Sequence, residues 1–228
     1  MSDGQIREFD RKIVFSLQFP GFTFAGQIQK VVSPIAIEDG LLYRDVISGE
    51  SNYWIIPIPY GNFEVQVSDS SSQRLLKGIA YHDHNWGSVP LQGFVREWVW
   101  GHFCHNGKLF IFLSFITSRG LLIHRGAYTQ ADNKICTTTS LHSNAFKVLS
   151  EASIPSQLTA SIQIDFSESP LSIIYPVSND RLLRSRENES HDNFVASYYR
   201  WASNGLNSSS EDNSALQGIT EYLRIKGR

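Results

Sequence analysis

Short runs in which apolar and polar residues alternate recur along most of the chain, and Gly, Pro, Asn and Ser clusters separate them. A period of two is typical of β-strands with one buried face, and no segment keeps a 3.6-residue apolar period. The pattern therefore predicts an all-β antiparallel fold with few, short helices. The expected strands are residues 12–19, 22–32, 41–47, 53–58, 63–67, 75–86, 94–104, 109–117, 121–128, 135–140, 145–150, 158–166, 194–201 and 216–225.

Three segments between these strands carry predictions of their own. The Asn106-Gly107 pair predicts a tight hairpin turn, because both residues tolerate the positive φ angles that such turns require. Residues 180–189 are mostly charged, which favours an exposed loop or a single solvated helix. The polar tract at 203–213 has little to bury and predicts a loop before the last strand.

Residues 78–87, Gly-Ile-Ala-Tyr-His-Asp-His-Asn-Trp-Gly, concentrate polar and aromatic groups on one predicted strand. A strand with so few aliphatic residues is poor core material, since each buried polar atom needs a partner. The stretch therefore predicts a functional site. Alternation along the strand divides its side chains between two faces, with His82, His84 and Trp86 on one and Tyr81, Asp83 and Asn85 on the other.

This stretch, the following Glu97-Trp-Val-Trp-Gly101, the Asn-Gly turn and the next apolar strand together resemble the carotenoid 1,2-hydratase (hydroxyneurosporene synthase) family. Gly218-Ile-Thr-Glu-Tyr222 is similar to the last strand of the same lipocalin-like superfamily. That superfamily includes two-lobed cyclases of the Diels-Alderase type from secondary metabolism. The resemblance implies a lipocalin-like β-barrel and a cofactor-independent enzyme for a hydrophobic polyene, terpenoid or polyketide intermediate.

The strands outnumber the eight of a small barrel, and residues 93–228 alone have about the length of a lipocalin-type barrel. We therefore expect a shortened N-terminal β lobe at residues 8–92 and a C-terminal lipocalin-like barrel at 93–228. The strand at 78–87 would then lie near the junction of the lobes, where ligand pockets often form.

The resemblance leaves three functions open. Family hydratases carry a Tyr and an Asp on the strand that follows the Trp-x-Trp hairpin, whereas residues 108–117 contain neither. Cyclisation is therefore the first expectation. Hydration of an isoprenoid or carotenoid double bond is the alternative, and the third is a non-catalytic binding protein for a hydrophobic small molecule.

Each chemistry assigns roles within the motif. For alkene protonation Asp83 would be the acid, alone or through a neighbouring histidine. For a pericyclic reaction His82 and His84 would donate hydrogen bonds to an electron-withdrawing carbonyl. The structural alternative is that Asp83 only orients a histidine or ties a loop. The expected substrate contacts are Tyr81, Asn85, Trp86, Glu97, Trp98 and Trp100.

The strand after the motif has structural alternatives too. The indoles of Trp98 and Trp100 would stabilise a carbocation, but at period two they share a face with His102 and suit a barrel core equally well. Glu97 reaches a site only if the odd-numbered positions of its strand face inward. Otherwise it forms a surface ion pair of little energetic value.

Other chemistries have weaker support. His82 and His84, with His102 and His105 in the next hairpin, could hold a metal ion, but a cupin would place a glutamate at position 88 or 89, where the chain has Ser88 and Val89. Gly-rich phosphate loops are absent from the sequence. We therefore expect no metal and no cofactor. Ser114 lacks the Gly-x-Ser-x-Gly context of a serine hydrolase, and His124 is expected to be solvated or structural.

Composition restricts the partners. Lys and Arg total 20 against 22 Asp and Glu, for a net charge of -2, which offers no basic surface for nucleic acid or an anionic membrane. Apolar runs are far shorter than the roughly 20 residues of a membrane-spanning helix. With two cysteines and no N-terminal signal pattern, the expected location is cytoplasmic and the expected partner is a hydrophobic small molecule.

Overall fold

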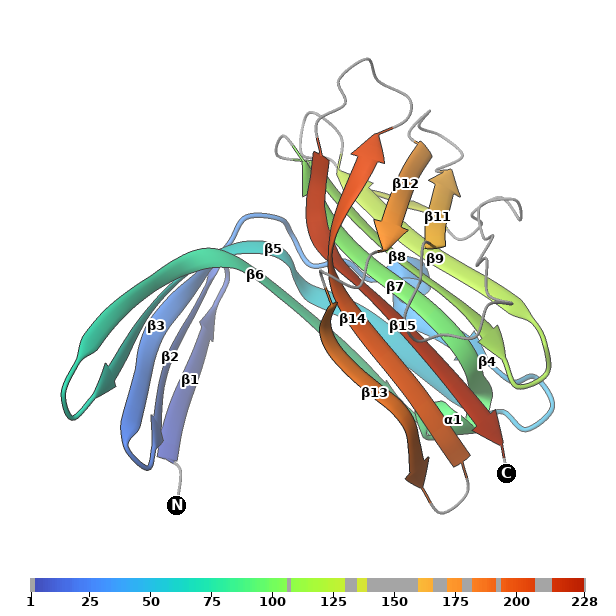
Figure 1. The fold of residues 1–228 in the computed structure, drawn as a ribbon, viewed down its shortest axis with the longest axis horizontal. Helices are drawn as coiled ribbons and strands as arrows, with labels where there is room; N and C mark the ends of the chain where they lie inside the picture. The colour runs from blue at the N-terminus through green and yellow to red at the C-terminus, as the bar shows by residue number, and fades with distance from the viewer. Residues whose placement is uncertain are drawn as a thin grey trace. The chain divides into compact units, whose positions relative to one another are not determined.

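The computed structural model describes residues 3–105, 108–129, 135–138, 160–165, 172–177, 182–191, 194–207 and 215–227, and it confirms an all-β fold of two antiparallel sheets (Figure 1). Helix in these residues is limited to a 3-10 turn, η1 (Ile37–Gly40), and a single α turn, α1 (Leu91–Phe94). The strands are β1 (Asp3–Phe9), β2 (Lys12–Phe19), β3 (Phe22–Lys30), β4 (Leu41–Arg44), β5 (Ser51–Asp69), β6 (Gln73–Gly87), β7 (Val95–His105), β8 (Lys108–Thr117), β9 (Leu122–Thr129), β10 (Ile135–Thr138), β11 (Ala160–Asp165), β12 (Ser172–Val177), β13 (Leu182–His191), β14 (Phe194–Asn207) and β15 (Ala215–Gly227).

The chain forms two compact units. Unit 1 contains residues 1–36 and 54–85, and unit 2 contains residues 37–53 and 86–228. The long strands β5 and β6 each belong to both units, because one division falls after Tyr53 and another after Asn85. The predicted lobes at 8–92 and 93–228 stay a prediction.

Unit 1 is built around a strongly two-sided sheet with the order β1-β2-β3-β5, in which β6 also pairs with β5. The antiparallel register aligns residues of one kind across the strands, as in the row of Phe15, Gly26 and Val65. We call the resulting hydrophobic side the apolar face. Its members are Ile6, Ile13, Phe15, Leu17, Phe19, Phe22, Phe24, Ile28, Phe63, Val65 and Val67.

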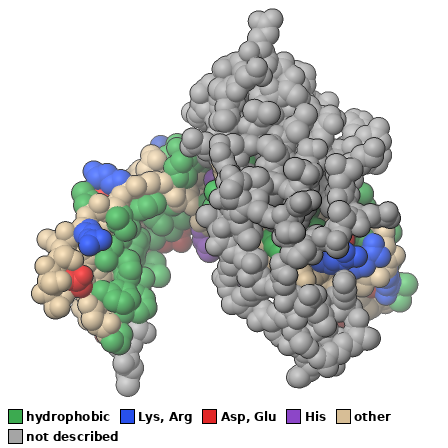
Figure 2. Space-filling view, viewed as in Figure 1, with side chains coloured by type: hydrophobic (Ala, Val, Ile, Leu, Met, Phe, Trp, Pro, Cys, Tyr) green, Lys and Arg blue, Asp and Glu red, His purple; other side chains and the backbone are tan. Residues whose placement is uncertain are grey.

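The opposite face of this sheet is polar, with side chains such as Gln5, Ser16, Gln27 and Glu64. The apolar face is nevertheless only partly buried, and most of its members are half-buried. Of its members only Val65 is buried, while Ile6 keeps 68% of its surface accessible and Phe22 keeps 41%. Figure 2 shows hydrophobic side chains gathered over unit 1. Since monomeric proteins rarely expose extended apolar patches, this face has the character of a binding surface.

Unit 2 has a more deeply buried sheet, with the order β10-β9-β8-β7-β15-β14-β12-β11 and β13 paired to β14. Its core lies on β7 and β8, where Phe103, Phe110 and Phe112 are fully buried. A Cβ added to Gly101 would lie 2.3 Å from the ring of Phe112 and 2.5 Å from that of Phe103. Glycine at this position therefore lets two parallel phenyl rings, 6.2 Å apart, cross the strand.

The predicted strands are largely confirmed, and the differences have local causes. Predicted strands 53–58 and 63–67 are one strand, β5, because the chain stays extended between them and pairs with β3 as far as Gly61. The β7–β8 hairpin is confirmed by the pairing of His105 with Lys108. Its turn residues, and the predicted strand at 145–150, lie outside the described residues.

Two sequence predictions are wrong. Residues 182–191 form neither a loop nor a helix but strand β13, which pairs with β14 between Leu182 and His191. Backbone hydrogen bonds to a neighbouring strand tolerate charged side chains at a sheet edge, so a charged composition does not exclude a strand. The tract at 203–213 begins as strand, since β14 continues to Asn207, and residues 208–213 lie outside the described part. The sequence pattern also missed β1 and β12.

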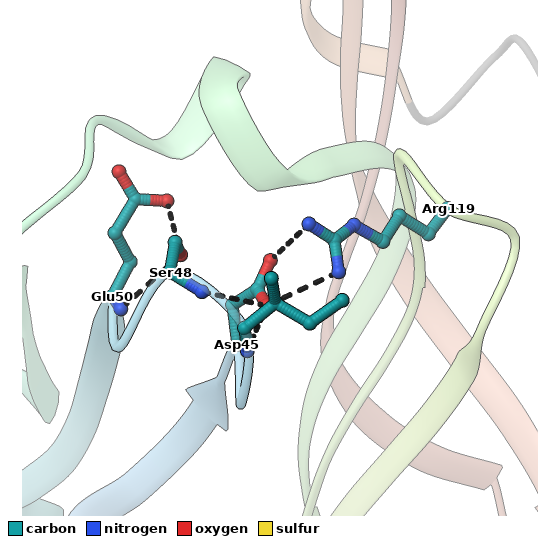
Figure 3. A network of polar contacts seen from close by, with 5 residues as sticks. Asp45, Ser48, Glu50 and Arg119 are labelled. Carbon is teal, nitrogen blue, oxygen red and sulfur yellow. Dashed lines mark hydrogen bonds and ion pairs between the residues drawn. The ribbon is translucent and has the colours of Figure 1, made fainter.

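A buried carboxylate joins two turns of unit 2 (Figure 3). Asp45, with a side chain only 8% exposed, accepts a 2.9 Å hydrogen bond from the backbone N–H of Ile47 and lies 2.7 Å from the guanidinium of Arg119. The backbone N–H of Ile47, the N–H of Ser48 and the charge of Arg119 together hold the pKa of Asp45 below its usual range, against the opposing effect of burial. The segment after β4 is thereby attached to the β8–β9 turn.

We expect the Asp45→Asn variant to melt at a lower temperature than the native protein at pH 7, and the difference to shrink at pH 3. The folded-state pKa is depressed, so the stabilisation is present above the unfolded-state pKa of about 3.9 and is lost as the pH falls through the folded-state value. Thermal unfolding followed by circular dichroism across this range measures it. Asp10→Asn, at an exposed turn of unit 1, is the matched control. A difference that stays constant between pH 7 and pH 3 contradicts the assignment.

Candidate functional site

Strand β6 carries the predicted motif and separates its side chains as alternation predicts. His82 and His84 are exposed, while Tyr81 and Asp83 are half-buried. A Cβ added to Gly78 would lie 2.6 Å from the ring of Phe63, so Gly78 points to the apolar face. Because residues two apart on a strand share a face, His82 and His84 lie on that same side of the sheet.

Asp83 lies on the opposite side of β6. Its Oδ2 accepts a 3.0 Å hydrogen bond from Nε1 of Trp54 on β5, and the indole of Trp54 is buried beside the equally buried Ile56 and Ile58. The hydrogen bond gives Asp83 a structural role that the sequence did not predict, because its carboxylate joins two strands through an indole. Within unit 1 the structure therefore separates Asp83 and Tyr81 from the histidine pair.

The remaining predicted residues are in unit 2, except Asn85, which is an exposed residue of unit 1. Trp86 is 43% exposed and stacks on Tyr53, with ring centroids 5.1 Å apart. Trp100 is buried and stacks on His102 at 6.4 Å, as their spacing predicts. Trp98 is half-buried on the same face.

The odd-numbered positions of β7 are the more deeply buried ones. Glu97 therefore meets the condition stated for it, that the odd-numbered positions of its strand face inward. Val99 and Phe103, at period two from Glu97, are at most 1% exposed. Glu97 itself is half-buried. Its carboxylate therefore lies at the margin of the core of unit 2 and is not a freely solvated surface group.

The sequence missed one polar pair. Oγ of Ser114 and Nδ1 of His124 lie 2.8 Å apart, and both residues are buried, so the expectation of a solvated His124 is wrong and a structural role stays open. Burial, followed by the nearby Arg125, lowers the pKa of His124 and keeps its imidazole neutral. The position of the turn could have indicated this pair. In a hairpin centred on Arg119, Ser114 and His124 are each five residues from the centre, so they face each other across β8 and β9.

A metal site finds no support in the described residues. No group of three or more His, Cys, Asp and Glu side chains is close enough there to hold a metal ion. A shallow depression of about 490 Å³ opens mainly among polar side chains of unit 1, including Gln27, Gln29 and the Lys77–Glu64 ion pair. It opens among Gln27, Asn62 and Glu64 on the polar side of the sheet, away from the side that carries His82 and His84.

No protein-family model matches the sequence. Over 39 residues, the chain is 46% identical to the quinolone epoxide rearrangement protein asqO of Emericella nidulans. The match covers 17% of this chain and 11% of asqO, so it links a short segment and not the whole proteins.

Solved structures share the fold. An ATTH protein of Nitrosomonas europaea has a TM-score of 0.60 at 14% identity over 96% of this chain and 66% of its own. Kievitone hydratase of Nectria haematococca scores 0.55 at 11% identity, covering 95% and 65% of the two chains. CghA scores 0.58 at 12%, covering 94% and 64%. The lipocalin-like fold implied by the resemblance is confirmed, and the chain spans about two thirds of the length of these three structures.

The Trp54–Asp83 hydrogen bond should contribute to the stability of unit 1. We expect Trp54→Phe to lower the free energy of unfolding by about 2 kcal/mol, since it removes the donor to a half-buried carboxylate. Asp83→Asn should cost less, about 1 kcal/mol, because its amide oxygen can still accept the hydrogen bond. Urea denaturation measures both, and Trp86→Phe, which alters an exposed indole, is the control. Equal losses for Trp54→Phe and Trp86→Phe would show that the hydrogen bond has no such role.

Proposed function

We propose that this chain binds a hydrophobic small molecule on the apolar face of unit 1 and promotes its cyclisation without a cofactor. One observation carries the proposal: His82 and His84 project from the same side of the sheet as the extended, partly exposed apolar face. A substrate with an apolar body and one polar end could contact both. The fold shared with CghA and kievitone hydratase supports a catalytic role, as does the short match to a rearrangement protein.

Binding would be driven by burial of apolar surface, which contributes about 25 cal/mol for each Å² removed from water. The phenyl rings of Phe19, Phe22 and Phe24 form an edge-and-stack cluster, with centroids between 5.1 and 5.9 Å apart. Flat, rigid rings suit the faces of a conjugated chain. The surface therefore favours an extended polyene over a compact polar metabolite.

Catalysis would depend on conformation and on hydrogen bonds. If the face holds a polyene folded back on itself, the reacting carbons approach each other and the entropic part of the activation barrier falls. An imidazole N–H from His82 or His84 to a conjugated carbonyl withdraws electron density and activates the adjacent double bond. In a pericyclic closure the new carbon–carbon bonds form from π electrons of the substrate, so no proton, electron or cofactor is consumed and the product is an isomer.

Of the other predicted site residues, Asp83 has a supporting part in this proposal. Asp83 holds β6 against β5 through Trp54 and is a positioning residue for the histidine pair. Tyr81 and Asn85 face away from the histidines, and Trp86, Glu97, Trp98 and Trp100 belong to unit 2, so this proposal does not use them, and their role as substrate contacts stays a prediction from the sequence. The proposed location is cytoplasmic, and no helix in the described ranges has the length and apolarity to cross a membrane.

Hydration of a double bond is the second candidate, favoured by the likeness of the fold to that of kievitone hydratase. It requires a proton donor beside the alkene, and Asp83 points away from the face that His82 and His84 share. The two reactions are distinguished by mass, since cyclisation leaves the substrate mass unchanged and hydration adds one water. Binding without conversion is the third outcome.

The apolar face can be tested directly with N-phenyl-1-naphthylamine, an uncharged fluorescent probe. We expect Phe24→Gln to weaken binding about fivefold to tenfold, because the variant places an amide in the centre of the face. Thr23→Gln, the preceding residue on the polar face of the same strand, is the matched control and should bind like the native protein. If both variants bind equally well, the probe is held elsewhere and the proposed site is wrong.

The histidines can be tested by turnover of linear polyenes with a conjugated carbonyl, followed by mass spectrometry. We expect His84→Ala, and to a similar degree His82→Ala, to lower kcat about a hundredfold with less than a twofold change in probe affinity. The control is Lys77→Ala, on the other side of the same strand. Unchanged kcat in both histidine variants, or loss of probe binding in parallel with kcat, contradicts the assignment.

A further inference from the structure

The depression on the polar side of unit 1 has no part in the proposed function. Its volume is about 490 Å³, and side chains of three neighbouring strands line it. The antiparallel register places Gln27 of β3 opposite Glu64 of β5, and Gln29 opposite Asn62. Paired strands lie about 4.8 Å apart, and residues two apart on one strand are about 6.7 Å apart. The four side chains therefore form a compact array.

The array has a more buried and a more exposed part. Gln27 and Glu64 are half-buried and form the floor of the depression, whereas Gln29 and Asn62 are exposed at its rim. Ile79 of β6 also lines the depression and is 54% exposed. A ligand seated here meets polar groups beneath it and one accessible apolar side chain beside it.

The charged groups of the depression balance each other. Nζ of Lys77 lies 3.3 Å from Oε2 of Glu64, and the two side chains are 64% and 45% exposed. Because the two opposite charges are paired and solvated, neither an anion nor a cation gains a strong net attraction. Recognition then depends on the neutral carboxamides.

The three carboxamides belong to Gln27, Gln29 and Asn62, and each offers a carbonyl oxygen as acceptor and an NH2 group as donor. Among the residues that the structure describes, these side-chain groups hydrogen-bond no other protein group. Asn is depleted in strands, yet Asn62 lies inside the long strand β5. A β-branched residue would suit the strand better, so folding alone does not account for an amide at this position.

We propose that the depression binds a neutral polyhydroxylated ligand, a sugar ring, through the carboxamides of Gln27, Gln29 and Asn62. A hydroxyl group both donates and accepts hydrogen bonds, so neighbouring hydroxyls of one ring match neighbouring amides of the array. The C–H groups of the ring would lie against Ile79. This site goes beyond the proposed function, because its binding groups are on the opposite side of the sheet from the histidine pair.

An extended peptide fits this surface less well than a sugar. Peptides add to sheets through the free backbone groups of an edge strand. The carboxamides are on β3 and β5, which are inner strands of the sheet and have a paired strand on each side. A ligand bound there is therefore recognised by side chains alone.

Saturation-transfer NMR on the full chain tests the site with three probes, the methyl glycosides of glucose, galactose and mannose. We expect millimolar, saturable binding of at least one probe, because an open site only exchanges hydrogen bonds to water for hydrogen bonds to amides. Gln27→Ala and Asn62→Ala should each weaken that binding about fivefold to tenfold, the usual effect of losing one hydrogen bond. Gln18→Ala is the matched control, since Gln18 is on the same polar face outside the depression.

The absence of saturable binding for all three sugars would overturn the proposal. Equal losses in Gln27→Ala and Gln18→Ala would overturn it too, because the polar face as a whole would then hold the sugar. Native far-UV circular dichroism checks the folding of each variant. Phe24→Gln, which alters the apolar face, should leave sugar binding within twofold, and a larger loss would contradict the assignment of a separate site.

Discussion

The proposed function of this molecule depends on one constraint, the alternation of side chains along paired strands. In unit 1 the register of β1, β2, β3 and β5 gathers apolar residues on one side and polar residues on the other. A shift of any one strand by a single residue would mix the two sides. The same rule sends His82 and His84 to the apolar side of β6 and Asp83 to the other, so it decides which motif residues can act together.

The separation of Asp83 from the histidines changes the chemistry that the motif can support. A carboxylate bound to Trp54 in a half-buried setting is suited to fixing two strands, whereas exposed imidazoles beside an apolar surface are suited to hydrogen-bonding a ligand. This division favours activation of a carbonyl over protonation of an alkene. It therefore supports cyclisation ahead of hydration, in agreement with the lack of a carboxylate on β8.

The sequence predicted features that follow from local periodicity and missed those that arise from pairing. The bounds of β2 and the β7–β8 hairpin followed from alternation and the Asn-Gly turn. Strand β13 could not be predicted from its charged composition, because its conformation comes from hydrogen bonds to β14. The burial of His124 was missed for a related reason, since only the β8–β9 register brings it against Ser114. The composition of 78–87 predicted a site, which stays a prediction, and gave no sign that Trp54 would donate a hydrogen bond to Asp83.

The most direct measurement of the central claim is photolabelling with an aliphatic diazirine, with the modified residues mapped by peptide mass spectrometry. An apolar ligand seated on unit 1 should label side chains of the apolar face, such as Phe15, Leu17 and Phe24, and an excess of an unlabelled polyene should suppress that labelling. Labelling that is spread equally over Ser16, Gln18 and other residues of the polar face, and that the polyene does not suppress, would contradict the account.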